Sequence, residues 1–333
     1  MMIKVIDIDN KYRESKRRGK RCPNLACAKV SGFYALLRGD VVGFDIPNPD
    51  KTYISCVFTK NSDYAWKEYE IAKEGTGEVY IGGSGVSLTW ELPKEIEFAK
   101  PDYNLYPYQE YSFGFSSRGC DRKCGFCIVH QKEGPFRRNQ HIKEFHDFRF
   151  KSCKLFDNNI LCDPDWFFEQ TNWAIDNKVQ LDMTQGFDIR KLTDEIAAQM
   201  KRTKFVDQQI RFAWDIPPFG ATEDQIVNGI EILRDHKINI RRNVSFYVLV
   251  GADWDGQKII EIPYAARDLY RVHKLRSLGA MAFVQKFHEH DKMLNHLARY
   301  SNKRELYRSC TFSEYLQEKA GASPHDPAAT MEN

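Results

Sequence analysis

The sequence predicts an α/β protein with two parts, an N-terminal open parallel sheet of the flavodoxin-like type and a partial (β/α)6 barrel with a C-terminal helical extension. Three observations carry this prediction. Short apolar runs alternate with amphipathic segments, which favours parallel strands joined by helices. A proline-containing stretch without clear periodicity interrupts the alternation. The second series holds six strand–helix units, too few for a closed eight-fold barrel.

These observations divide the chain into four segments. An α/β domain is expected first, then a linker on the surface, then the partial barrel, and last the helical extension with its tail. In chain order these segments are residues 1–90, 91–110, 111–287 and 288–333.

The first domain alternates strands with two amphipathic helices. Gly39 is expected to close the first helix, and Ser62 is a candidate cap of the second. The expected strands are residues 3–8, 41–45, 53–59 and 78–86. The expected helices are residues 24–39 and 62–74.

The barrel series has longer units and stronger helix signals. Asp163 and Pro164 form a cap and first turn, and Thr222 with Gln225 resembles a capping box. The expected strands are residues 111–117, 153–161, 179–189, 210–217, 244–253 and 279–287. The expected helices are residues 164–177, 193–203, 222–237 and 257–275, with further helix in 288–320.

Composition limits the class of protein. Apolar residues make up 42% and aromatic residues 13% of the 333 residues, enough for a buried core. The net charge of +3 does not by itself indicate a nucleic-acid partner. No run approaches 18 apolar residues, and the first residues read as a strand rather than a signal segment. We therefore expect a cytoplasmic protein without a membrane partner.

The cysteines are the main chemical signal. Nine is an odd number for a disulfide framework, and six of them are scattered. Cys120, Cys124 and Cys127 instead share a CxxxCxxC spacing in "SSRGCDRKCGFC". A structural zinc site needs four closed ligands, usually in two separated halves, and no second half follows here. Three thiolates on one loop can hold an iron–sulfur cluster with one open iron, with Arg118 supplying positive charge nearby.

This loop, placed after the first strand of a partial barrel, resembles the radical S-adenosylmethionine (SAM) superfamily. The motif specifically resembles the branch whose members carry a cobalamin-binding-like domain in front of the barrel. Phe126 before the third cysteine, the order of domains and the segment "TQGFDIR" at 184–190 support the resemblance. It implies a 4Fe–4S cluster held by the three cysteines and S-adenosylmethionine as the second cofactor. It further implies reductive cleavage to a 5′-deoxyadenosyl radical that abstracts hydrogen from an unidentified substrate.

The resemblance also assigns contacts to S-adenosylmethionine. Phe126 falls on the adenine side, and the amine site falls on "FDNN", although the usual two glycines and glutamate are absent there. The resemblance assigns Val248 and Gly251, on the fifth strand, to a further contact with adenine. It assigns Asp215, on the fourth strand, to a polar contact with the ribose, and the alternative is that Asp215 is only a turn residue. The residues so assigned are Asp157, Asn158, Asn159, Val248, Gly251 and Asp215.

Substrate residues are expected at the carboxyl ends of the barrel strands. The candidates are Gln185, Asp188 and Arg190. A purely structural ion pair between Asp188 and Arg190 is the alternative.

The first domain lacks the features of a cobalamin-ligating one. It has no DxHxxG motif, and no histidine precedes His130. If cobalamin binds, it does so without a histidine ligand from this domain. The alternative is a degenerate domain that keeps the fold, binds no cobalamin and covers the barrel. A cobalamin-dependent methyltransferase or a methylthiotransferase-like enzyme remains an alternative within the enzymes.

Partners are suggested by charge and by the expected chemistry. Residues 11–21 are strongly basic, which fits either a solvated loop or a contact to phosphate or nucleic acid. A radical SAM enzyme further implies a flavodoxin- or ferredoxin-type reductant. From another class, a non-catalytic zinc- or cluster-binding module that contacts nucleic acid through this loop is the competing interpretation.

Overall fold

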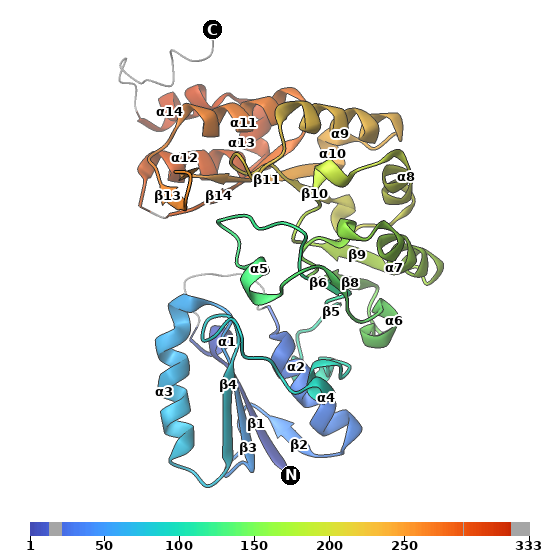
Figure 1. Cartoon of the computed structure of the whole chain (residues 1–333), viewed down its shortest axis with the longest axis vertical. Helices are drawn as coiled ribbons and strands as arrows, with labels where there is room; N and C mark the ends of the chain where they lie inside the picture. The colour runs from blue at the N-terminus through green and yellow to red at the C-terminus, as the bar shows by residue number, and fades with distance from the viewer. Residues whose placement is uncertain (13–21, 289, 321–333) are drawn as a thin grey trace. The chain divides into compact units, whose positions relative to one another are not determined.

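The computed structural model describes residues 1–12, 22–288 and 290–320 (Figure 1). The chain forms two compact units. The N-terminal unit comprises Met1–Gly119 and Ile128–Asp157, and the C-terminal unit comprises Cys120–Cys127 and the chain from Asn158 onward. The cysteine loop therefore belongs to the C-terminal unit.

A four-stranded parallel sheet forms the centre of the N-terminal unit. Its order is β2 (Val41–Gly43), β1 (Met2–Asp7), β3 (Lys51–Ser55) and β4 (Glu78–Gly82). This 2-1-3-4 order is that of the flavodoxin-like doubly wound fold, so the predicted open parallel sheet is confirmed.

Helices cover both faces of this sheet. Helix α2 (Leu25–Ser31) lies on one face and α3 (Ser62–Lys73) on the other (Figure 1). Strand alternation supplies each core: Val5 packs toward α2, and its neighbour Ile6 packs toward α3. The cap of α3 is Asn61 rather than the predicted Ser62, because Ser62 already has helical backbone angles.

The predicted surface linker is wrong for much of residues 91–110. This stretch forms α4 (Lys94–Glu97) and a short turn of 3₁₀ helix, and Tyr103 and Tyr106 are 4% and 2% exposed. The Tyr103 hydroxyl donates to the Phe145 carbonyl oxygen (2.6 Å). The Tyr106 hydroxyl donates to the carboxylate of Asp7 (2.8 Å). The segment lacks periodicity, yet its aromatic rings fill the core and their hydroxyls find buried partners.

The rest of the N-terminal unit leads into and out of the cysteine loop. Strand β5 (Ser112–Gly114) pairs in parallel with β8 (Ser152–Leu155). Strand β6 (Ser117–Arg118) pairs in an antiparallel manner with β7 (Arg137–Arg138). This unit also holds three short α-helices, α1 (Ile8–Lys11), α5 (Val129–Lys132) and α6 (Ile142–Phe145), and a π-helical segment, Gly32–Leu37, that continues α2.

A second parallel sheet forms the C-terminal unit. Its order is β10 (Ile210–Ala213), β11 (Val244–Val250) and β14 (Met281–Lys286). Strand β9 (Gln180–Met183) precedes it, and an isolated bridge joins Phe187 to Phe212 of β10. A strand is therefore present at each of the six places predicted for the barrel, although each is shorter than expected, and the α/β class is confirmed.

The helices of this unit test the predicted start signals. Asp163 caps α7 (Pro164–Asp176), and Thr222 with Gln225 forms a capping box at the start of α9 (Glu223–Asp235), both as predicted. The other helices are α8 (Asp194–Arg202), α10 (Ile240–Asn243), α11 (Ala266–Ser277), α12 (Lys292–Ser301), α13 (Arg304–Ser309) and α14 (Phe312–Ala320). The last three confirm a helical extension after residue 288.

One predicted helix begins late. Residues 257–275 were expected to be helical, but α11 starts only at Ala266. The preceding chain forms a hairpin of β12 (Ala252–Trp254) and β13 (Ile259–Glu261), with Gly256 at a φ of 97° in its turn.

Among the described residues, no helix is both long enough and apolar enough to cross a bilayer.

Candidate metal centre

The three cysteines lie on one loop, Cys120–Cys127, between β6 and α5. All three are half-buried, and none of them forms a disulfide with another described residue. The backbone N–H of Cys127 donates to the carbonyl oxygen of Cys124 over 3.0 Å, which closes a turn. Thiols on one such loop can approach a metal centre from a single side.

Asp157, which follows β8, holds the chain that leads into this loop. Its carboxylate accepts hydrogen bonds from the backbone N–H groups of Ser116 (2.7 Å) and Ser117 (2.9 Å), and from both serine hydroxyls. Burial raises the pKa of Asp157 to about 6, although these donors act to lower it. The Asp157 carboxylate, for which a contact to the amine is predicted, is thus already engaged by the two serines.

Arg118 does not serve as the free positive charge expected beside the cluster. Its guanidinium donates to Glu133 (3.0 Å) and Glu97 (2.5 Å). Glu97 also pairs with the buried ammonium of Lys29 at 2.9 Å. Two carboxylates therefore neutralise Arg118, because a charge buried in the N-terminal unit requires partners.

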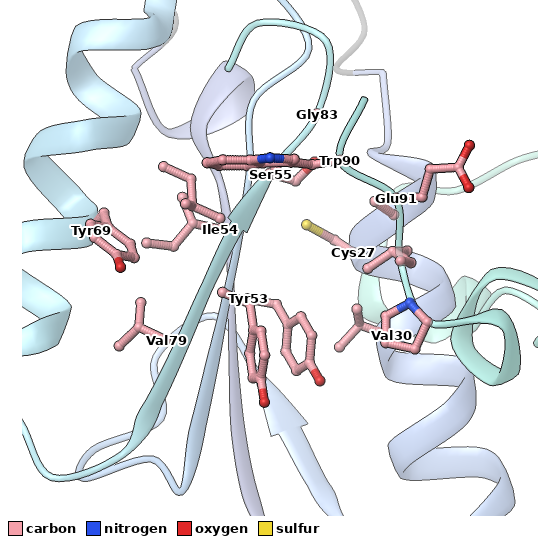
Figure 2. A pocket seen from close by; sticks show the side chains of 16 residues that line it. Cys27, Val30, Tyr53, Ile54, Ser55, Tyr69, Val79, Gly83, Trp90 and Glu91 are labelled. Atoms are coloured by element: carbon pink, nitrogen blue, oxygen red, sulfur yellow. The ribbon is translucent and has the colours of Figure 1, made fainter. Parts of the chain in front are cut away.

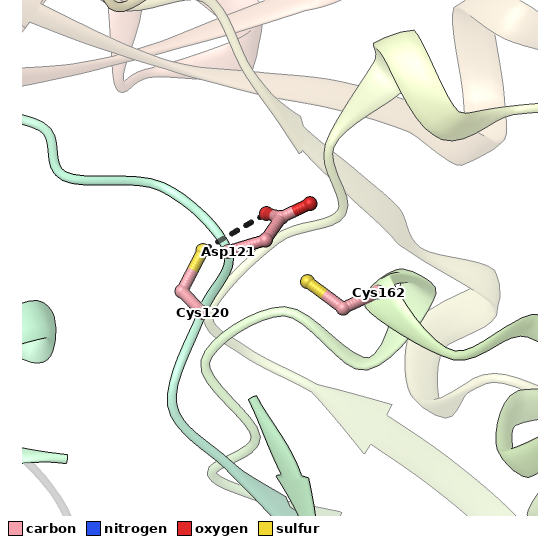
Figure 3. A group of neighbouring side chains, drawn as sticks. All are labelled: Cys120, Asp121 and Cys162. Carbon is pink, nitrogen blue, oxygen red and sulfur yellow. Dashed lines mark hydrogen bonds between the residues drawn. The ribbon is translucent and has the colours of Figure 1, made fainter. Parts of the chain in front are cut away.

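Cys120 lies in a cluster of polar groups (Figure 3). Its Sγ, the Sγ of Cys162 and a carboxylate oxygen of Asp121 all lie within 4.8 Å of one another. A hydrogen bond from Cys162 lowers the pKa of Cys120 to about 6, with burial opposing and the N–H of Arg122 and the amide of Asn159 assisting. Lys191 pairs with the Asp121 carboxylate at 2.5 Å. The donors from Cys162, Arg122 and Asn159 therefore favour the thiolate of Cys120, against burial and the neighbouring carboxylate of Asp121.

Cys124 has a different environment. Burial raises its pKa, Arg122 opposes this, and the nearby carboxylate of Asp215 adds to the rise. Arg122 in turn donates to the carbonyl oxygen of Phe219 over 2.8 Å. Cys124 therefore gives up its proton less readily than Cys120 until a cation binds it.

Aromatic rings enclose the turn of the loop. Phe126 meets Phe219 edge-on at 5.9 Å between ring centroids, and Phe219 meets Trp254 of β12 at 5.1 Å. A Cβ at Gly125 would lie 3.0 Å from Cζ3 of Trp254. Gly125 thus allows the loop to approach this aromatic wall closely.

The predicted substrate residues separate into a pair and a single side chain. Arg190 binds Asp188 in a bidentate manner, with Nε–Oδ1 at 2.6 Å and Nη2–Oδ2 at 2.8 Å. Its remaining Nη1 donates to the carbonyl oxygen of Phe219. Gln185 is exposed. The structure therefore shows the ion pair that was the alternative interpretation for Asp188 and Arg190.

Asp215 lies after β10, among several cations. Burial raises its pKa to about 6, while Arg271, Arg190 and Arg122 act in the opposite direction. No hydrogen bond to its carboxylate occurs within the part of the chain that the structure describes. The group can therefore accept a proton from a ligand without first losing an internal partner.

Val248 and Gly251 lie in and just after β11. The Val248 side chain is fully buried in the sheet, where it stands opposite Val284. The Gly251 N–H donates to the carboxylate of Asp268 at 3.0 Å, and Asp268 pairs with Arg271 at 2.8 Å. This buried pair fixes the end of β11, where the adenine contact was predicted.

Asn159 is the member of the predicted amine site that reaches the cysteine loop. Its Nδ2 lies 3.7 Å from the Sγ of Cys120. Its Oδ1 is buried and has no hydrogen-bond partner in the described residues. Asn158 lies beside it in the chain, in a loop after β8. Three thiols with an orphaned carbonyl oxygen nearby fit an iron–sulfur cluster together with a ligand that carries an amine.

The N-terminal unit holds a separate cavity of about 310 Å³ (Figure 2). The ends of β3 and β4, helix α2 and residues 90–93 line it, and its labelled side chains include Tyr53, Trp90 and the thiol-bearing Cys27. No histidine occurs in residues 1–129. The cavity can therefore offer apolar and aromatic contacts but no imidazole ligand for cobalt.

The basic loop is described only at its start. Residues 13–21 lie outside the described residues, and with them lies the predicted nucleic-acid contact. Lys11 is described, and its ammonium pairs with Glu68 at 2.7 Å.

Sequence reasoning missed several residues of this centre, namely Arg122, Cys162, Phe219, Trp254 and Arg271. One signal could have revealed Cys162. It follows the second predicted barrel strand, and the carboxyl ends of neighbouring parallel strands meet at one edge of a sheet. Arg122, Phe219 and Trp254 belong to loops and a hairpin, and Arg271 to helix α11, and their contacts join residues distant in the sequence.

The comparisons with known proteins find a likeness of structure but not of sequence. No model of a known protein family matches the chain, and no curated protein does. The radical S-adenosylmethionine methyltransferase TsrM from Kitasatospora setae, solved with cobalamin and a 4Fe–4S cluster bound, has a TM-score of 0.61 and 10% sequence identity. The match covers 85% of this chain and 74% of TsrM.

The second solved structure is the cobalamin-dependent S-adenosylmethionine radical enzyme OxsB with aqua-cobalamin bound. The match covers 96% of this chain and 55% of the OxsB chain, with a TM-score of only 0.40 and 10% sequence identity. The match to TsrM concerns the fold alone at such low identity. The predicted resemblance to the radical SAM superfamily is thereby confirmed at the level of the fold.

Proposed function

We propose that this protein is a radical SAM enzyme in which Cys120, Cys124 and Cys127 are the thiolate ligands of a 4Fe–4S cluster. The observation that carries the proposal is three half-buried cysteines on one loop, in a chain with the fold of TsrM. When bound, such a cluster supplies the electron that cleaves S-adenosylmethionine into methionine and a 5′-deoxyadenosyl radical.

The neighbouring residues have separate tasks in this proposal. Asn159 accepts a hydrogen bond from the methionyl amine through its orphaned Oδ1. Asp215 accepts one from a ribose hydroxyl. Phe126, beside Phe219, contacts the adenine and helps to keep water from the centre. Val248 and Gly251 complete the adenine side.

The reaction on the substrate is hydrogen abstraction in this proposal, with Gln185 and the Asp188–Arg190 pair as substrate contacts. TsrM is a methyltransferase with bound cobalamin, which makes methyl transfer the second candidate. Cobalamin would then bind without a histidine from residues 1–129. Methylthio transfer usually needs a second cluster, and the six cysteines outside the loop form no tight triplet in the sequence.

Anaerobic reconstitution with iron and sulfide tests the proposal. We expect about four irons per chain, a brown protein, and release of 5′-deoxyadenosine after reduction in the presence of S-adenosylmethionine. A flavodoxin- or ferredoxin-type protein is the reductant we propose. One zinc ion per chain with no cleavage would instead support the competing zinc-binding module, and nucleic-acid binding would then be measured with residues 11–21 neutralised.

A further inference from the structure

Cys162 is a half-buried thiol outside the cysteine loop, and it faces that loop. Its Sγ, the Sγ of Cys120 and a carboxylate oxygen of Asp121 lie within 4.8 Å of one another. Figure 3 shows the three side chains converging from two separate segments of the C-terminal unit. By contrast, Cys27, Cys56 and Cys153 are buried in apolar cores.

The backbone holds Cys162 in this position. It ends a short 3₁₀ turn, Ile160–Cys162, in which its N–H donates to the carbonyl oxygen of Asn159 at 3.1 Å. The next residue, Asp163, caps helix α7, where Pro164 occupies the first turn. Because this turn is fixed, the thiol of Cys162 stays close to Cys120 at little cost in conformational entropy.

The other groups of the cluster indicate which atoms bind a metal. Lys191 already pairs with the Asp121 carboxylate at 2.5 Å, so this carboxylate has a cation. Asn159, 6% exposed, contributes the buried Oδ1 that has no partner among the described residues and lies on a side chain in contact with Cys120. The two thiols suit a soft, thiophilic metal.

We propose that Cys162 is a fourth thiolate ligand of the metal centre when S-adenosylmethionine is absent. This inference rests on the proposed function, because it assigns a protein ligand to the iron that the three cysteines of the loop leave without one. Binding of the amine and carboxylate of S-adenosylmethionine then requires Cys162 to leave that iron and to take up a proton from solvent. Cys162 thereby protects the open iron from loss between turnovers.

The test compares wild-type protein with C162S, using C310S as the matched control. Cys310 is also a half-buried free thiol of the C-terminal unit, and its Sγ lies 3.5 Å from the carbonyl oxygen of Leu306. Each reconstituted protein is treated with ferricyanide without S-adenosylmethionine, and the 3Fe–4S signal is measured by electron paramagnetic resonance. We expect C162S to lose the fourth iron at least ten times faster than wild type and C310S.

Alkylation gives a second readout that needs no substitution. In the reconstituted wild type, iodoacetamide should label Cys162 slowly without S-adenosylmethionine and at least five times faster with it, as mapped by mass spectrometry. Equal iron loss in wild type and C162S, or labelling of Cys162 that S-adenosylmethionine does not change, would overturn the inference while leaving the three-cysteine cluster in place. Wild-type protein that assembles no cluster at all would instead overturn the proposed function.

Discussion

Arg122 and Arg190 donate to the same acceptor, the carbonyl oxygen of Phe219, over 2.8 and 2.7 Å. Arg122 belongs to the cysteine loop, and Arg190 lies in the segment that follows β9. One backbone oxygen therefore joins the loop to a second segment of the C-terminal unit. Two guanidinium groups held there favour an anionic metal centre beside Cys124.

Removing the Arg190 side chain should destabilise the C-terminal unit. R190M leaves Asp188, whose side chain is 9% exposed, without its bidentate partner, and we expect a loss of about 1–3 kcal/mol. Urea unfolding of the cluster-free protein measures this. The double variant D188N/R190M should recover part of the loss, since no unpaired charge remains. An R190M protein as stable as wild type would contradict this role of the pair.

Replacing Cys124 by alanine should abolish the cleavage of S-adenosylmethionine and leave the chain folded. Cys124 is half-buried, so the change removes a ligand without opening a large cavity. C310A, which changes a half-buried thiol of the same unit away from the loop, is the control and should keep wild-type iron content. Circular dichroism, iron analysis and assay of 5′-deoxyadenosine measure the outcome. Full cleavage activity in C124A would rule out the assigned ligand set.

A side chain larger than hydrogen at Gly125 should displace the loop. A Cβ there would lie 3.0 Å from Trp254 and 3.3 Å from Ile259, and we expect G125V to cost about 1–3 kcal/mol and to lower iron content. Adding W254A should restore iron content in part, because it removes the ring that the new side chain meets. G82A is the control, since its Cβ would meet no heavy atom within 4 Å. Equal iron content in G125V and wild type would refute the close approach.

The raised pKa of Asp157 predicts a dependence of stability on pH. Its pKa is about 6 in the folded chain against 3.8 ordinarily, so the folded state binds the proton more tightly. Stability should therefore fall as pH rises from about 4 to about 6 and then level off, with a contribution of about 3 kcal/mol for a shift of two units. Urea unfolding of the cluster-free protein across this range measures the slope.

D157N should flatten this slope, because the amide does not titrate. Asp215 also has a pKa raised to about 6, so D215N should remove its own separate share in the same pH window. A slope unchanged in D157N would show that the Asp157 carboxyl titrates alike in the folded and unfolded chains.

Local signals allowed much of the fold to be predicted. Asp163 with Pro164, and Thr222 with Gln225, act within a single helical turn, so the sequence places these helix starts correctly. Gly39, at a φ of 71°, similarly follows the π-helical segment Gly32–Leu37 that continues α2, close to the predicted end of this helix. The CxxxCxxC spacing is equally local, which is why it indicated the candidate centre.

Contacts between distant residues could not be predicted in this way. Tyr103 and Tyr106 lie in an aperiodic stretch, and only their buried hydroxyl partners show that the stretch belongs to a core. The proximity of Cys162 to Cys120 depends on how two strand ends meet. The hairpin around Gly256 replaced a predicted helical turn because strand pairing outweighs the weak helix propensity there.

The clasp of Asp157 on Ser116 and Ser117 has a consequence for the evolutionary history of the chain. The Asp157 carboxylate accepts hydrogen bonds from two backbone N–H groups and two hydroxyls just before the cysteines. A substitution of Asp157 alone would therefore leave these buried donors without an acceptor, and a substitution of the serines alone would remove donors from a buried carboxylate. Distant homologues should therefore keep or exchange this acid and the serine pair together. Such covariation would identify them even where overall sequence similarity has faded.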